Sequence, residues 1–99
     1  MTDKPDNSPL MAIPESFESG GSVISVQVMK TIRGAHGDWS SGRNLIRIRK
    51  DTPENMLQTF LHEYFHASLE RYGHPEASEN EGLVEALAQG FYQFLKTAE

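Results

Sequence analysis

Two histidines, His62 and His66, lie four positions apart in the sequence, and Glu63 directly follows the first of them. Residues four apart on a helix lie one turn above each other on the same face, so both imidazoles can bind one metal ion. From the next position along, Glu63 can reach a water molecule on that ion without being a ligand itself. This spacing predicts a zinc ion held by His62 and His66, with Glu63 as the catalytic residue.

A catalytic zinc site uses three protein ligands and leaves one position open, so a third donor must come from elsewhere in the chain. Because the sequence contains no cysteine, that donor is a histidine or a carboxylate. Glu81 is the preferred third metal ligand and Glu85 the alternative, since Glu81 lies nearer the expected buried edge of its helix. Ser78 and Glu81 also fit a capping box, in which Glu81 would bond only to its own helix. His74 and His36 are the remaining candidates for the third ligand, but both are interpreted as loop residues, and His36 is also a candidate for lining the cleft.

The segments before the motif show the alternation that is typical of strands. Residues 22–29 are rich in β-branched side chains, and residues 44–50 alternate isoleucine with arginine. The glycine-punctuated stretch between them has room for at most one short strand, around residues 36–40. We therefore expect a sheet of two or three strands, one of which has a basic face toward solvent.

Two helices are expected to carry the candidate site. Thr52, followed by a proline, can cap the first helix, and Gly73 supplies its stop. The second helix is expected to begin between residues 75 and 79 and to run to about Lys96, with its apolar stripe centred near Phe91. The order of strands followed by helices predicts an α+β fold.

Composition divides the chain into a tail and one domain. Residues 1–21 are rich in proline and serine and are expected to form a disordered tail, which leaves residues 22–99 as the domain. The formal net charge of −5 disfavours nucleic-acid binding. Because the sequence shows neither an apolar run that could span a membrane nor a leader peptide, we expect a cytoplasmic protein.

Two stretches of the sequence, residues 59–67 and residues 80–85, resemble the gluzincin zinc metallopeptidases. At this chain length the sequence is similar to the minigluzincins and to small metallopeptidase-like proteins of phages and prophages. In thermolysin-type gluzincins the glutamate helix carries Asn-Glu-x-x-Ser-Asp, in which the glutamate binds the metal and the aspartate supports a ligand histidine. The resemblance implies Glu81 as the zinc ligand and Glu85 as the supporting acid, although Val84 stands in place of the serine.

The resemblance covers about residues 22–96 and departs from related families in two respects. Metzincins would have a glycine and a third histidine at the positions where Leu69 and Tyr72 stand. No residue matches the tyrosine or histidine with which larger gluzincins stabilise the oxyanion. Tyr72, Tyr92 and His36 are candidates for that role by their chemistry alone.

The predicted function is zinc-dependent peptide-bond hydrolysis, with Glu63 as the general base on a zinc-bound water. The expected substrate is a peptide or an unfolded protein that lies along an exposed strand edge in the segment 36–50. No membrane partner is expected, and a nucleic-acid partner is not favoured. The alternative is a non-catalytic, zinc-stabilised interaction module that binds a protein or nucleic-acid partner, for which a fourth protein ligand on the metal would be typical.

Overall fold

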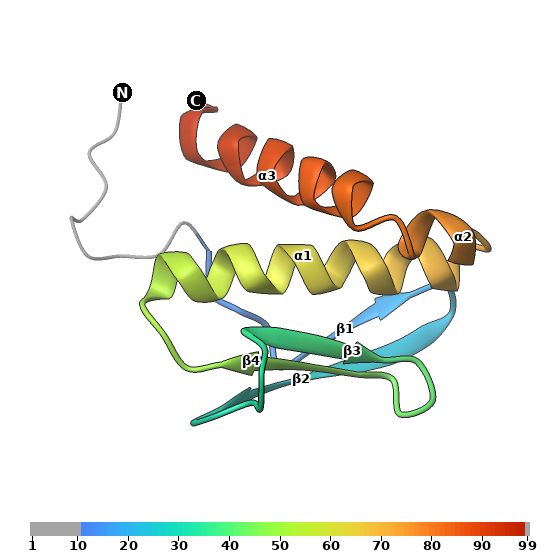
Figure 1. Cartoon of the computed structure of the whole chain (residues 1–99), viewed down its shortest axis with the longest axis horizontal. Helices are drawn as coiled ribbons and strands as arrows, with labels where there is room; N and C mark the ends of the chain where they lie inside the picture. The colour runs from blue at the N-terminus through green and yellow to red at the C-terminus, as the bar shows by residue number, and fades with distance from the viewer. Residues whose placement is uncertain (1–10, 99) are drawn as a thin grey trace.

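The chain forms four strands followed by three helices, arranged as a sheet beneath two long helices (Figure 1). The structure is a computed structural model that describes residues 11–98, so residues 1–10 of the expected tail lie outside it. Within this range no helix combines the length and the apolar character needed to cross a membrane. The α+β prediction is confirmed. The elements are β1 (Ser16–Ser19), β2 (Ser22–Met29), β3 (Gly37–Ser40), β4 (Leu45–Arg49), α1 (Pro53–Arg71), α2 (Pro75–Ser78) and α3 (Glu81–Thr97).

The sheet is mixed, with the strand order β1-β2-β4-β3. β1 and β2 form an antiparallel hairpin, β2 and β4 are parallel, and β3 and β4 form a second antiparallel hairpin. Because β3 precedes β4 in the chain but lies outside it in the sheet, the second hairpin folds back and inserts β4 beside β2. β3 is therefore an edge strand.

The sheet has one strand more than the two or three that the sequence predicts. The additional strand, β1, falls in the segment 1–21 that was expected to be disordered, so the ordered part of the chain begins earlier than predicted. Gly20 and Gly21 both have positive φ, +57° and +81°, which is the backbone of a tight two-residue hairpin turn. The turn brings β1 into register with β2 although β1 has only one apolar residue, Phe17.

The core lies between the inner face of the sheet and α1. Phe17 packs against the rings of Phe60 and Tyr64, at centroid distances of 5.9 and 5.4 Å. The predicted alternation in β4 is confirmed, because its isoleucines are buried while its arginines are partly exposed. The fully or almost fully buried side chains of this layer are Ile24, Ile46, Ile48, Leu57, Phe60 and Leu61.

The boundaries of α1 are those that the sequence predicts. The side chain of Thr52 accepts a hydrogen bond from the backbone nitrogen of Asn55 at 3.2 Å, and a proline occupies the first helical position. Gly73 takes a φ of +90° just after the helix ends, a conformation that other residues rarely adopt. The His-Glu-x-x-His motif thus lies in the middle of a 19-residue helix, one side of which packs on the sheet.

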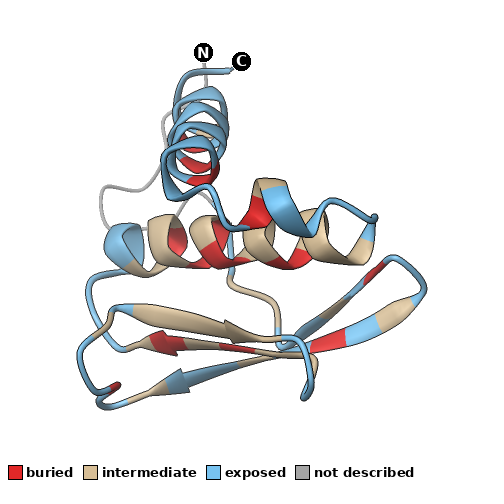
Figure 2. Cartoon of the chain, turned by 45° about the vertical axis from the view of Figure 1, so that its right-hand side comes forward, coloured by how far each residue is buried: buried red, intermediate tan, exposed pale blue. Residues whose placement is uncertain are grey.

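The predicted second helix is in fact two helices. The first, α2, has four residues, and α3 follows the N-cap residue Asn80. Val84, Ala88 and Tyr92 are the buried residues of α3, whereas Phe91, the expected centre of the buried stripe, is exposed. The position of the stripe was wrong because the apolar side chains of α3 cover a wider arc than α1 can bury, and much of the helix remains exposed (Figure 2).

Candidate metal centre

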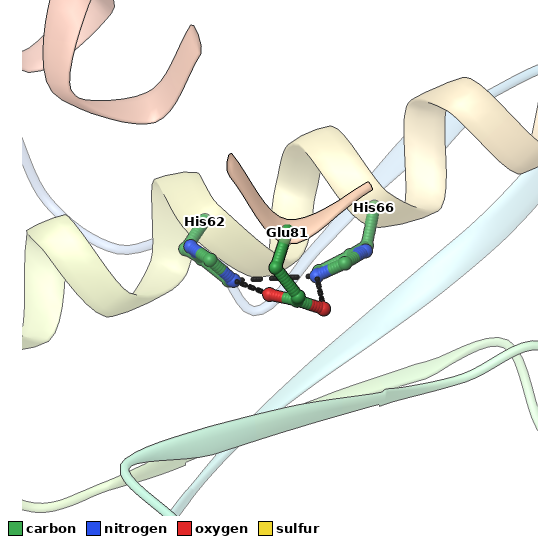
Figure 3. Close-up of side chains that lie close together, drawn as sticks. All are labelled: His62, His66 and Glu81. Atoms are coloured by element: carbon green, nitrogen blue, oxygen red, sulfur yellow. Dashed lines mark hydrogen bonds and ion pairs between the residues drawn. The ribbon is translucent and has the colours of Figure 1, made fainter. Parts of the chain in front are cut away.

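His62, His66 and Glu81 point toward one another between the middle of α1 and the start of α3 (Figure 3). The Nε2 atoms of the two histidines are 3.2 Å apart. Oε1 of Glu81 lies 3.0 Å from Nε2 of His62, and Oε2 lies 3.1 Å from Nε2 of His66. Potential ligand atoms from two helices therefore surround one point.

The spacing of these atoms matches the size of a zinc site. Zinc binds imidazole nitrogen at about 2.0–2.1 Å and carboxylate oxygen at about 2.0–2.2 Å, so the ligand atoms of a tetrahedral site lie about 3.3 Å from one another. In the cluster the two Nε2 atoms are 3.2 Å apart, and they lie 3.0 and 3.1 Å from the two different carboxylate oxygens of Glu81. A zinc ion would therefore fit this donor set with small movements of the side chains.

The outer nitrogen of each histidine has a partner that fixes the direction of its ring. Nδ1 of His62 lies 2.8 Å from Oε1 of Glu85, and an ionised carboxylate can only accept a hydrogen bond. Nδ1 of His66 lies 3.1 Å from Oγ of Ser78, whose hydroxyl can donate to Oε2 of Glu70 at 3.0 Å. With these groups as acceptors, both Nδ1 atoms can act as hydrogen-bond donors. In the neutral imidazoles, the two Nε2 atoms are left with lone pairs that face the cluster.

This arrangement brings lone pairs together and so favours a bound cation. The two Nε2 atoms and the carboxylate of Glu81 repel one another unless a proton or a metal ion lies between them. Burial acts to lower the pKa of His62, but the carboxylates of Glu85, Glu63 and Glu81 outweigh it, and the pKa is raised. The cluster is thus an electron-rich site that positive charge stabilises.

Ser78 and Glu81 do not form the capping box that their spacing permits. Asn80 caps α3 instead, since its side-chain oxygen accepts a hydrogen bond from the backbone nitrogen of Leu83 at 3.1 Å. The carboxylate of Glu81 is consequently free to reach the histidines, and the buried Ser78 bonds to His66. This contact of Ser78 was missed in the sequence because a serine three residues before a glutamate is typical of a helix cap.

Glu85, the alternative third ligand, lies behind His62 rather than in the cluster. Its Oε1 contacts Nδ1 of His62, and its Oε2 accepts a hydrogen bond from the side-chain amide of Gln89 at 3.0 Å. Glu85 is therefore placed to orient a histidine, as the gluzincin resemblance implies for this position. Of the two acids, Glu81 and not Glu85 belongs to the group of described residues that could hold a metal ion.

Glu63 differs from the other acidic side chains of the site in its burial. It is 8% exposed and follows His62 on α1. Burial raises the pKa of its carboxyl to about 7, a shift that the charge of His62 opposes and the charges of Asp38 and Glu81 increase. In the metal-free chain this carboxyl therefore holds a proton to higher pH than an ordinary glutamate does.

Two adjoining grooves run past the cluster and share Gly37, His62 and Glu63 in their walls. One continues along the first turns of α1, where its walls are polar. The other continues between the edge strand β3 and α2, where Trp39 and Ser78 line it. We refer to the two together as the site groove. The side chains of His62, His66, Glu81 and Glu63 therefore all line this groove.

The remaining candidate residues differ in their relation to this groove. His36 lines it, and its Nδ1 lies 2.7 Å from Nη2 of Arg49. His74 precedes α2 and Tyr72 follows α1, and neither lines the groove. The hydroxyl of Tyr92 donates to a glutamate of α1 at 3.3 Å, away from the cluster. Among the described residues, His36 is thus the one oxyanion candidate that lies in the groove.

Comparisons of the chain with protein-family models, with curated proteins and with solved structures gave no match. The gluzincin resemblance therefore rests on residues of the chain itself, the His-Glu-x-x-His motif and the pair formed by Asn80 and Glu81. The structure adds the convergence of His62, His66 and Glu81 across two helices into a group that could hold a metal ion.

Proposed function

We propose that this chain is a zinc-dependent peptidase, in which His62, His66 and Glu81 hold the metal and Glu63 is the general base. The observation that carries the proposal is the convergence of two Nε2 lone pairs and a carboxylate at zinc-like spacing, next to a buried carboxyl. Among residues 11–98 the cluster has three donors, one fewer than a closed structural zinc site, and this supports an open coordination position.

Zinc held by these residues would polarise a peptide carbonyl and lower the pKa of a water molecule. Glu63 follows the ligand His62 directly and lines both halves of the site groove, which supports its contact with an attacking water. Its carboxylate takes the proton from that water and then donates it to the leaving amine. Glu85 and Ser78 hold the Nδ1 atoms of His62 and His66, so the Nε2 atoms face Glu81 and would be the nitrogens that bind the metal.

The edge strand β3 supports an extended peptide as the substrate. The backbone nitrogen of Arg49 donates to the backbone oxygen of His36 at 2.7 Å, and hydrogen-bonded pairs alternate with non-bonded pairs in antiparallel strands. In the observed register, the N–H and C=O groups of Gly37 and Trp39 therefore point away from β4 and toward the open edge. Both residues line the site groove, so a peptide paired with them would pass the histidine cluster.

The test of this proposal is the variant Glu63→Gln, which keeps the shape of the side chain and all three ligands. Its zinc content and melting temperature should stay near those of the wild type, while cleavage of unstructured peptides or denatured proteins should fall by about 10²-fold or more. Mass spectrometry of a diverse peptide library measures the cleavage. Glu76→Gln, an exposed position on α2, is the matched control and should retain full activity.

A different result would contradict the proposed peptidase activity without contradicting the proposed metal site. If the folded, zinc-loaded wild type cleaves no peptide above the level of Glu63→Gln, the peptidase proposal is wrong. The zinc-stabilised interaction module then becomes the better explanation. X-ray absorption spectroscopy would support that module directly if it found four protein donors on the zinc instead of three and a water.

A further inference from the structure

One exposed side of α3 is apolar and carries no charge. From residue 86 to residue 95 the sequence has no charged side chain, and only Ala88 and Tyr92 in this stretch are buried. A helix face in contact with water normally carries charged residues, so an uncharged exposed face marks an interaction surface. The large apolar side chains on this face, with their exposed fractions, are Leu83 (40%), Leu87 (37%), Phe91 (39%) and Phe94 (60%).

The shape of this face is a ridge beside a shallow furrow. Leu83, Leu87 and Phe91 are spaced by four residues and form one row along the helix. The neighbouring row runs through Ala86 and Gly90, both exposed, to Phe94 at its end, and a Cβ added at Gly90 would meet no atom within 4 Å. Helices pack by fitting the ridge of one into the furrow of another. This face has both parts at the same spacing and is therefore complementary to itself.

We propose that α3 pairs with α3 of a second copy of this chain, antiparallel about a two-fold axis. If Leu87 lies opposite Gly90 of the second copy, the same register places Phe91 opposite Ala86, and Leu83 opposite Phe94. Leu87 and Phe91 of each copy then enter the furrow of the other, Leu83 meets the ring of Phe94 at the end of that furrow, and the contacts repeat in both directions as an isologous interface requires. The negative net charge of each copy opposes association only weakly, because the acidic side chains Glu81 and Glu85 turn toward α1.

The size of the face agrees with a weak dimer. A fully covered aromatic side chain buries roughly 150–250 Å². The two partly exposed phenylalanines, the two smaller leucines and the flanking small residues therefore offer on the order of 500 Å² per copy. A pair would bury about 1,000 Å² in total, which is the lower limit for a specific interface. Residues 1–10 are a poor alternative occupant, since they carry three charged residues and two prolines.

Sedimentation velocity of the full chain over a wide concentration range tests the proposal. The wild type should change from monomer to dimer, with a dissociation constant on the order of micromolar. Gly90→Gln fills the furrow with a good helix former, so its melting temperature should not fall, yet its dissociation constant should rise at least about tenfold. Phe94→Gln should weaken the dimer similarly by removing the most exposed ring.

Lys96→Gln is the matched control, because it introduces the same residue on the polar side of α3 and should leave the dimer intact. A wild type that stays monomeric at every concentration would overturn the proposal and leave the face to a different partner. Dimerisation that Gly90→Gln and Phe94→Gln do not weaken would overturn it too, because the contact would then lie on another surface.

Discussion

Nδ1 of His66, on α1, lies 3.1 Å from Oγ of Ser78, the last residue of α2. The hydroxyl of Ser78 also lies 3.0 Å from Oε2 of Glu70 and 3.2 Å from the backbone oxygen of His66. Ser78 is the one buried residue of a helix with only four residues. The contribution of α2 to the site is therefore to place a hydroxyl against the ring of His66, so that Nε2 faces Glu81.

Ser78→Ala is expected to weaken zinc binding about 10- to 100-fold, because the His66 ring loses the group that fixes its tautomer and orientation. Competition with a chromophoric chelator measures the affinity. Ser68→Ala is the matched control, since that buried hydroxyl lies on α1 and has no hydrogen-bond partner in the described part of the chain. If both variants lose affinity equally, Ser78 has no specific role in orienting His66.

Replacing Glu81 and Glu85 one at a time distinguishes the third metal ligand from the acid that orients His62. Glu81→Gln should abolish tight zinc binding, because an amide is a much poorer zinc ligand than a carboxylate. Glu85→Gln should weaken binding by only about tenfold, since an amide oxygen can still accept the hydrogen bond from His62. The same chelator competition measures both variants. The opposite ranking would make Glu85 the ligand and leave Glu81 outside the coordination sphere.

The local part of the site could be predicted from the sequence because one helix carries it. The helical period alone brings together His62, Glu63 and His66, and the residues that flank the helix are of the types that cap helices. Glu81 lies on another element, α3. Glu81 was preferred over Glu85 as the third ligand because the apolar stripe of this helix was expected to be centred at Phe91, but the buried stripe lies elsewhere. The preference agrees with the observed cluster although its reason was wrong.

Contacts that depend on packing between elements could not be predicted in the same way. Ser78 contacts Glu70 and His66, which lie 8 and 12 residues before it in the chain. The period of a helix or a strand does not predict contacts between separate elements. β1 has only one apolar residue in four, so its propensity for a strand is low. The paired glycines Gly20 and Gly21 were the available signal, since Gly-Gly between two strands is typical of a tight hairpin.

Removal of the metal should lower the stability of the domain. A ligand that binds only the folded state adds about 2.7 kcal/mol when its concentration is 100 times its dissociation constant. Because a metal bound by the proposed ligands would join α1 to the start of α3, we expect a clear fall in melting temperature on chelation and full recovery when zinc is returned. Differential scanning calorimetry measures this. In Glu81→Gln the chelator should have no effect, and an equal effect there would place the metal elsewhere.

Gly37→Ala should disturb the edge strand beside the site. A Cβ at Gly37 would lie 2.6 Å from Cγ2 of Thr59 and 2.9 Å from the backbone oxygen of Arg47, so β3 would have to move away from α1. We expect a loss of about 1–3 kcal/mol in the free energy of unfolding, measured in urea. Gly42→Ala is the control, because its Cβ would meet nothing within 4 Å. Equal stability of the two variants would contradict the close approach of β3 to α1.

Asp38 and Arg47 join the edge strand to β4 through two side-chain hydrogen bonds, one of them 2.9 Å long. The hydrogen bonds from Arg47 hold the pKa of Asp38 below its ordinary value of 3.8. A carboxyl whose pKa is lower in the folded state adds stability above the unfolded pKa, and this stability is lost as the pH falls through the folded pKa. Asp38→Asn should therefore be less stable than the wild type at neutral pH and equally stable well below pH 3.8.

The size of this difference should be small, about 0.5 kcal/mol, because the Asp38 side chain is 38% exposed and solvent screens the pair. Urea unfolding at a series of pH values measures it. Arg47→Gln should show a similar loss at neutral pH, and the double variant should lose less than the sum of the two, since both changes remove one interaction. A difference between wild type and Asp38→Asn that persists undiminished in acid would assign the effect to packing rather than to charge.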